Sequence, residues 1–117
     1  MEDFEGAKAS VNIYDFKVGD ESTDYTVTYA GSSGLEGFPP SGTKFSTFDR
    51  DNDSDPVRNC ARQFTGAWWY TSCHVSDLNG LYLRGHHKNW GNGVNWYSFR
   101  GNRYSLKNTV MKVRAST

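Results

Sequence analysis

The stretch Asp49–His74 reads DRDNDSDPVRNCARQFTGAWWYTSCH and holds most of the chain's recognisable chemistry. Four aspartates stand at alternate positions at its start, Asp49, Asp51, Asp53 and Asp55. A cysteine, a Trp-Trp-Tyr run and a second cysteine with a following histidine complete it. The pattern predicts a loop for a hard cation, followed by a small aromatic-rich module between two cysteines.

The acidic part of this stretch is typical of a calcium loop. Calcium takes oxygen ligands from carboxylates, main-chain carbonyls and water, and carboxylates at alternate positions of a curved loop can point at one centre. The loop is not an EF-hand, because Ser54 stands where that motif has glycine and Cys60 where it has glutamate. The alternative is a solvated acidic turn whose aspartates cap helices. We expect calcium.

The two cysteines, Cys60 and Cys73, lie 13 positions apart. This separation suits a short disulfide loop, which would stabilise the fold by about 3 kcal/mol, and it indicates an oxidising compartment. A zinc ribbon and a redox Cys-x-x-Cys motif are both excluded by the spacing. Cys73 with His74 could form a thiolate–imidazole nucleophile, but we favour the structural disulfide. His86 and His87 have no third ligand nearby in the sequence, so we expect solvent rather than zinc there.

Composition limits the class of protein. With 117 residues the chain is one domain, and 15% aromatic residues indicate that aromatic side chains build much of its core. No apolar run approaches the roughly 20 residues of a membrane span, and the acidic start does not resemble a signal peptide. Residues 1–56 hold twelve acidic and four basic residues, whereas residues 57–117 hold nine basic and one acidic. The basic residues are dispersed, which argues against nucleic acid as a partner.

The periodicity predicts short strands and one short helix. Alternating apolar positions predict a bulged strand over residues 11–18 and a partner strand over residues 25–29, which together form a hairpin. Asn59 is a cap for a helix that would span Cys60–Phe64. Ala30–Gly42 is predicted as loop, because it has four glycines and two prolines. Further strand candidates are Lys44–Phe48, Trp96–Phe99, Tyr104–Leu106 and Val110–Val113.

Six segments together resemble the fibrinogen-related domain, the globular module of fibrinogen chains, ficolins, tachylectins, tenascins and angiopoietins. They are FSTFDRDND, NCARQFTGAWWYTSCH, LNGLYLRG, NGVNWYSF, YSLK and VMKVR, in this order from Phe45 to Arg114. The resemblance implies an irregular α+β fold with short antiparallel strands, few short helices and long loops. It covers the C-terminal half or so of that domain; the segments of its N-terminal subdomain are absent from this sequence.

The resemblance implies where calcium would bind. It assigns two ligands to the side chains of Asp51 and Asp53 and two to the backbone carbonyls of Asp55 and Val57, with Asp49 behind them in the second shell. It also divides residues 1–117 into 1–48, a remnant of a central sheet region, and 49–117, which carries the calcium site and a ligand pocket.

The implied pocket lies beside the calcium loop and takes acetyl groups of N-acetylated sugars. In this family the peptide before the second cysteine is cis, which is Ser72–Cys73 in this chain, and the amides of Cys73 and His74 donate to the acetyl carbonyl. The resemblance assigns the walls of the pocket to Phe64, Trp90 and Asn102, where Asn102 stands in place of the usual aromatic residue. It assigns one further backbone N–H donor to Gly91.

The implied function is therefore recognition. We expect a secreted, calcium-dependent lectin of innate-immune type for acetylated glycans, or alternatively an extracellular protein–protein interaction module. No set of residues in the sequence resembles a catalytic site, so we do not expect an enzyme. Strand edges that the absent subdomain would cover predict self-association.

Overall fold

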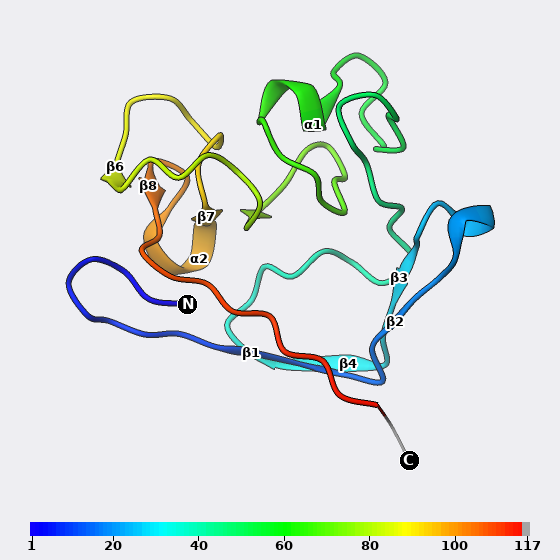
Figure 1. Ribbon diagram of the computed structural model, residues 1–117, viewed down its shortest axis with the longest axis horizontal. Helices are drawn as coiled ribbons and strands as arrows, with labels where there is room; N and C mark the ends of the chain where they lie inside the picture. The colour runs from blue at the N-terminus through cyan, green and yellow to red at the C-terminus, as the bar shows by residue number, and fades with distance from the viewer. Residues whose placement is uncertain (116–117) are drawn as a thin grey trace.

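The computed structural model describes residues 1–115, which fold into the irregular arrangement of short elements shown in Figure 1. The elements, in chain order, are β1 (Val11–Tyr14), β2 (Lys17–Val18), the 3-10 helix η1 (Glu21–Thr23), β3 (Val27–Thr28), β4 (Gly31–Gly34), α1 (Cys60–Gln63), β5 (Ser76–Asp77), β6 (Gly85–His86), β7 (Asn95–Trp96), α2 (Tyr97–Arg100) and β8 (Tyr104–Ser105). All strand pairs among them are antiparallel.

Two antiparallel ribbons form the N-terminal part. β2 pairs with β3, which confirms the predicted hairpin in part. Asp15, with a left-handed φ of 57°, separates β2 from β1. β1 pairs instead with β4, whose sequence is Gly-Ser-Ser-Gly, so the prediction of loop over Ala30–Gly42 is wrong in its first residues. A ladder of backbone hydrogen bonds needs no particular side chains when a neighbouring strand is supplied, and here β1 supplies it.

The prediction of a strand over Trp96–Phe99 is also wrong beyond its first residue. Trp96 pairs with Ser76 in the β5–β7 sheet, and its indole Nε1 donates to the carbonyl of Glu36 at 2.7 Å. The chain then turns into α2, which Gly101 ends with a left-handed φ of 81°. The strand predicted over Tyr104–Leu106 is confirmed for its first two residues, which form β8.

Two other predicted strands do not form. In Lys44–Phe48, Ser46 makes only an isolated bridge to Trp68, while Thr47 and Arg50 exchange hydrogen bonds across a tight turn. Val110–Val113 is irregular and largely exposed. It crosses the β1–β4 ribbon in the view of Figure 1 and lines a common groove with β1, but no backbone hydrogen bond joins it to that ribbon within residues 1–115.

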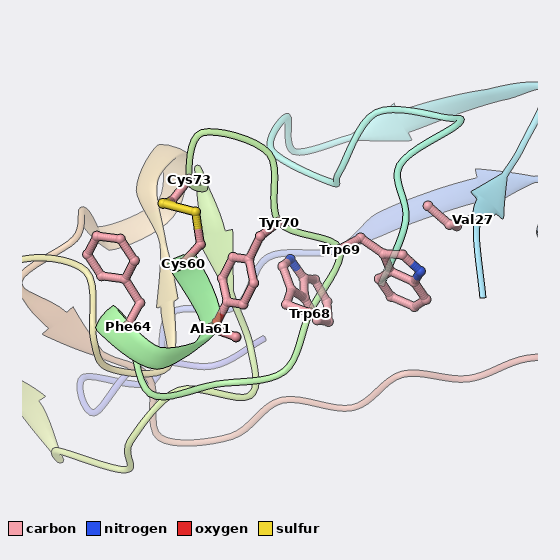
Figure 2. Packing of buried hydrophobic residues seen from close by; sticks show 8 residues of the cluster. All are labelled: Val27, Cys60, Ala61, Phe64, Trp68, Trp69, Tyr70 and Cys73. Carbon is pink, nitrogen blue, oxygen red and sulfur yellow. A yellow bond between two sulfur atoms is a disulfide. The ribbon is translucent and has the colours of Figure 1, made fainter. Parts of the chain in front are cut away.

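The core lies around the two cysteines and the tryptophans. α1 begins at Cys60, where the Asn59 side chain accepts a hydrogen bond from the Arg62 N–H at 3.1 Å, as predicted for a helix cap. Figure 2 shows the packed side chains, which extend from the disulfide to β3; they are Val27, Cys60, Ala61, Phe64, Trp68, Trp69, Tyr70 and Cys73. No helix within residues 1–115 has the length and apolar character required to span a membrane.

Candidate functional site

The acidic loop is curled by its own aspartates. The carboxylates of Asp51, Asp53 and Asp55 each accept a hydrogen bond from the amide two residues further on, at 3.2, 3.0 and 2.9 Å. Such turns follow directly from the placement of aspartates at alternate positions. The second oxygen of Asp53 accepts the N–H of Cys60 at 2.9 Å, which ties the loop to the start of α1. Asp49 accepts from the hydroxyl of Thr47 instead, so its second-shell role stays a prediction.

The charges of this loop are not equivalent. Burial raises the pKa of Asp53, and the neighbouring carboxyl of Asp51 raises it further. The pKa of Asp55 is well below its usual range, because the backbone N–H groups of Arg58 and Val57 and the Arg58 guanidinium all donate to it. The Asp55 carboxylate is therefore paired with a cationic group, whereas Asp51 and Asp53 accept backbone N–H groups but have no cationic group within 4.0 Å in residues 1–115.

This arrangement fits a hard cation. The carbonyls of Asp55 and Val57 accept no hydrogen bond from any other described residue, so they are free for a metal. No group of three or more His, Cys, Asp or Glu side chains gathers around one point within residues 1–115. A cation held here would therefore need backbone carbonyls and water beside Asp51 and Asp53, which is the type of ligand set that calcium accepts.

The disulfide loop is bonded to the acidic loop. Cys60 and Cys73 form a disulfide with a Cα–Cα distance of 5.5 Å, as predicted. Near its second cysteine, the Ser72 hydroxyl donates to Asp55 Oδ2 at 3.0 Å. The N–H of Ser54 donates to the carbonyl of Thr71 at 3.3 Å. Two direct hydrogen bonds thus join the acidic loop to Thr71 and Ser72.

The turn at the second cysteine presents two amides. The Ser72–Cys73 peptide bond is cis, as the resemblance implied. The Cys73 carbonyl accepts the N–H of Thr71 at 2.7 Å. In the described part of the chain, neither the Cys73 nor the His74 N–H donates to a protein acceptor. Both remain available for an external one.

An aromatic cluster lies beside this turn. The ring of His74 meets Phe64 edge-to-face at a centroid distance of 4.8 Å and stacks on Trp90 at 5.7 Å. Phe64 is buried, whereas Trp90 is 46% exposed and can therefore cover a ligand. The structure thus brings together four of the predicted pocket residues, Phe64, Cys73, His74 and Trp90.

The surroundings of the His74 ring favour its neutral form. Its Nε2 lies 2.8 Å from the carbonyl of Gly91, which requires the hydrogen to be on Nε2. Its Nδ1 is buried without a protein partner in residues 1–115. Burial lowers the pKa of His74, and the positive charge of Arg58 lowers it further, against the opposing effect of the Gly91 carbonyl.

Two of the predicted pocket roles differ from the observed geometry. Gly91 was expected to offer its N–H to a ligand, but that N–H already donates to the carbonyl of Asn102 at 2.7 Å. Asn102 was expected to be a wall, but it is 6% exposed and it contacts the cluster through this carbonyl. Gly91 serves packing instead, since its φ is +79° and a Cβ would lie 3.0 Å from Nε2 of His74.

Sequence reasoning missed Arg58. Its guanidinium forms the ion pair with Asp55 at 2.7 Å and lies 5.9 Å from the centroid of the Phe64 ring. It therefore links the acidic loop to the aromatic cluster. The two adjacent histidines lie outside this site. His86 is exposed, as expected, and meets Tyr104 edge-to-face at 4.9 Å, whereas His87 is half-buried and its Nε2 forms a hydrogen bond of 3.2 Å with the side-chain amide of Asn95.

Comparison with known proteins identifies the family. The family model "Fibrinogen beta and gamma chains, C-terminal globular domain" matches residues 1–116. The chain belongs to this family. Fibrinogen C domain-containing protein 1 is 45% identical over 122 residues in Xenopus tropicalis, and the Homo sapiens protein is also 45% identical. Both alignments cover 97% of this chain and 26% of the relative.

Solved fibrinogen-like domains confirm the fold. The globe domain of human ANGPTL2 superposes with a TM-score of 0.85 at 38% identity, and that of human ANGPTL6 with 0.83 at 37%. These matches cover 92% and 91% of this chain, and 51% and 50% of the solved chains. A lamprey fibrin D-dimer, complexed with the peptide Gly-His-Arg-Pro-amide, matches with 0.80 at 27% identity over 91% of this chain and 40% of its own. The chain thus spans about half of a fibrinogen-like globe, and domains of this family are recognition modules.

Proposed function

We propose that the chain is a calcium-dependent extracellular recognition module that binds acetylated glycans. One observation carries this proposal: the acidic loop is hydrogen-bonded to the turn that offers the free amides of Cys73 and His74, and the aromatic cluster lies beside that turn. A cation site, a pair of donors and an apolar wall thus belong to one bonded unit. The disulfide supports an oxidising, extracellular location and secretion.

Each part of the unit has a role in this proposal. Asp51 and Asp53, with the carbonyls of Asp55 and Val57, would hold calcium, which would neutralise the carboxylate pair and order the loop. The amides of Cys73 and His74 would donate to the acetyl oxygen. Trp90 and Phe64 would pack against the methyl group, and the neutral His74 ring would keep charge away from it.

A glycan array with calcium, and again with a chelator, tests the proposal. We expect binding to N-acetylated sugars that is lost with the chelator and is competed by N-acetylglucosamine but not by glucose. The variant Asp51→Asn with Asp53→Asn should lose the rise in melting temperature that calcium produces, because only a ligand of the folded state stabilises it. Asp20→Asn, an exposed helix cap elsewhere, is the matched control. An unchanged calcium response in the double variant would refute the metal assignment.

A protein ligand is the second candidate. The peptide complex of the lamprey fibrin relative supports it, because that fibrinogen-like protein binds a basic peptide. This alternative would be favoured if the chain bound no glycan on the array but bound Gly-His-Arg-Pro-amide saturably, as measured by calorimetry. Loss of that binding in Trp90→Ala would assign the peptide to the same pocket.

Self-association is proposed for a different surface. The residues of β1 line a groove of about 1210 Å³ together with Val110, Met111 and Val113, and β1 pairs with β4 alone among the described strands. These three side chains are 50–72% exposed. An apolar groove beside an unpaired strand edge is suited to a second copy of the chain. The division into residues 1–48 and 49–117 is likewise proposed, with the groove belonging mainly to the first part.

A further inference from the structure

A second hollow lies on the acidic half of the molecule, between the β2–β3 ribbon and residues 45–52. It has a volume of about 600 Å³, and its lining includes none of the proposed direct calcium ligands or acetyl-pocket residues, although it includes Asp49, the predicted second-shell residue of the calcium site. The rings of Phe45, Trp69 and Tyr25 line it together with the carboxylates of Asp24 and Asp49. Phe45 and Trp69 pack edge-to-face at 5.3 Å, so this part of the lining is continuous with the aromatic core.

The wall of the cavity is preformed. Asp24 and Tyr25 have left-handed φ values of 55° and 52°, which side-chain-bearing residues rarely adopt. Two bonds hold them there: the Trp69 indole N–H donates to the carbonyl of Tyr25 at 2.9 Å, and the Phe45 N–H donates to that of Asp24 at 3.0 Å. Two consecutive strained residues, each tied to an aromatic residue of the lining, indicate a surface built in a fixed shape.

The charges around the cavity are unbalanced toward negative. Asp49 is oriented by the Thr47 hydroxyl at 2.7 Å, and no cationic group lies within 4.0 Å of its carboxylate in residues 1–115. Asp24 is only loosely paired, with Lys44 at 3.6 Å. Arg50 is the one basic residue in the lining, and its guanidinium is directed to Glu21 at 3.8 Å. The wider segment 1–56 has the same sign, with twelve acidic and four basic residues.

Aromatic rings and carboxylates in one lining are complementary to a cation on an apolar stem. The ring faces attract a guanidinium or ammonium group, while the methylene stem packs on the same rings. An anion would be repelled by the carboxylates, and a neutral apolar group would leave them unused. We propose that this cavity binds an arginine or lysine side chain of a partner protein, at a site that borders the calcium loop through Asp49 but contains no proposed direct metal ligand and no residue of the aromatic cluster.

Small probes test this without the partner. Butylguanidinium carries the head group and stem of arginine, and butylurea has nearly the same shape without the charge. Each is titrated into the ¹⁵N-labelled full chain in the presence of a chelator, and the indole N–H signal of Trp69 and the amide signals of residues 24, 25 and 45 are followed. We expect saturable shifts with butylguanidinium, at least fivefold weaker binding of butylurea, and weaker binding at high salt.

Variants test whether the Asp49 carboxylate contributes to butylguanidinium binding. Asp49→Asn should weaken butylguanidinium binding at least threefold, whereas Glu36→Gln, which removes an exposed charge outside the cavity, should not. Equal binding of the two probes, or an unchanged affinity in Asp49→Asn with native-like spectra in both variants, would overturn the proposal. Since no calcium or acetyl group is present, the result is independent of the proposed lectin function.

Discussion

The two N-terminal ribbons and the C-terminal part of the molecule are stabilised by different interactions. Among residues 9–34, which form the two ribbons, Val27 is the only buried side chain. Among the described residues, all of the buried aromatic side chains and the disulfide lie in residues 60–106. The ribbons are therefore held by backbone hydrogen bonds and a few contacts, whereas the C-terminal part has a core of its own. We infer that local stability differs accordingly, and that hydrogen exchange is faster in β1–β4 than around α1.

The first residues of the chain also contact the C-terminal part of the molecule. Glu2 exchanges backbone hydrogen bonds with Asn108, and the buried Asp3 pairs with Arg100 at 3.1 Å. Arg100 in turn lies 4.2 Å from the ring centroid of Tyr104. The first residues of the chain thus pack with the C-terminal core, and the contrast applies to the ribbons alone.

The largest expected effect is removal of the disulfide. Cys60→Ser with Cys73→Ser should lower the free energy of unfolding by about 3 kcal/mol, because the cross-link closes a loop of 13 positions. Urea denaturation measures the loss, and hydrogen exchange should show the C-terminal part becoming as labile as the ribbons. Unchanged stability would mean that the aromatic packing alone orders residues 60–73.

The next effect concerns a buried acid in the same core. Asp77 is fully buried, and its Oδ1 accepts the Tyr70 hydroxyl at 2.7 Å, while Oδ2 has no partner in the described part of the chain. Burial raises the pKa of Asp77 to about 8, against the Tyr70 hydrogen bond. Stability from the neutral carboxyl is therefore complete below about pH 4 and is lost as the pH rises through about 8.

Asp77→Asn should remove this pH dependence. Asparagine keeps the donor and acceptor of the neutral acid and cannot ionise, so we expect a gain of about 2 kcal/mol at pH 7. Melting temperatures between pH 5 and 9 measure it, and the advantage of the variant should grow with pH. Tyr70→Phe removes the one hydrogen-bond partner that the Asp77 carboxyl has within residues 1–115, and it should destabilise the fold instead. A constant difference between wild type and Asp77→Asn at all pH values would contradict the assignment.

The fold was predictable where side chains decide the local structure. Asn59 is a strong helix cap and α1 begins directly after it, and the alternation over residues 25–29 predicted β3. The failures lie where a tertiary neighbour decides. β4 has no strand-forming side chains but pairs with β1, and Trp96 is followed by a helical turn rather than more strand. Val110–Val113 has strand-forming side chains and no partner to pair with in residues 1–115.

For the candidate site, the sequence indicated residue types better than their roles. The aspartates at alternate positions led to the curled loop, and the two cysteines to the disulfide. The role of Gly91 was missed, because it depends on a hydrogen bond to Asn102, eleven positions away. Arg58 was missed because one basic residue after a proline carries no signal of its own. The calcium ligands and the acetyl pocket remain predictions.

A smaller effect is expected from a single methyl group in the aromatic cluster. Gly91→Ala should cost about 1–2 kcal/mol and weaken any ligand of the cluster, because it combines a left-handed φ with a close approach to His74 and Phe64. Gly101→Ala is the matched control, with a φ of 81° and no atom within 4 Å of the added Cβ. Chemical denaturation measures the free energy of unfolding of both variants. The backbone strain is common to the two, so the difference between them gives the cost of the close contacts at Gly91. An equal cost in the two would mean that the cluster tolerates the methyl group.

The smallest effect on stability is expected at the groove. Met111→Ser with Val113→Ser replaces side chains that are 50% and 72% exposed, so the free energy of unfolding should change by less than about 0.5 kcal/mol. The same change should weaken self-association, because it removes apolar area from the surface proposed for a second copy. Sedimentation equilibrium measures this. Phe48→Ser, at an exposed position outside the groove, is the control. If both variants associate as the wild type does, the groove is not the contact surface.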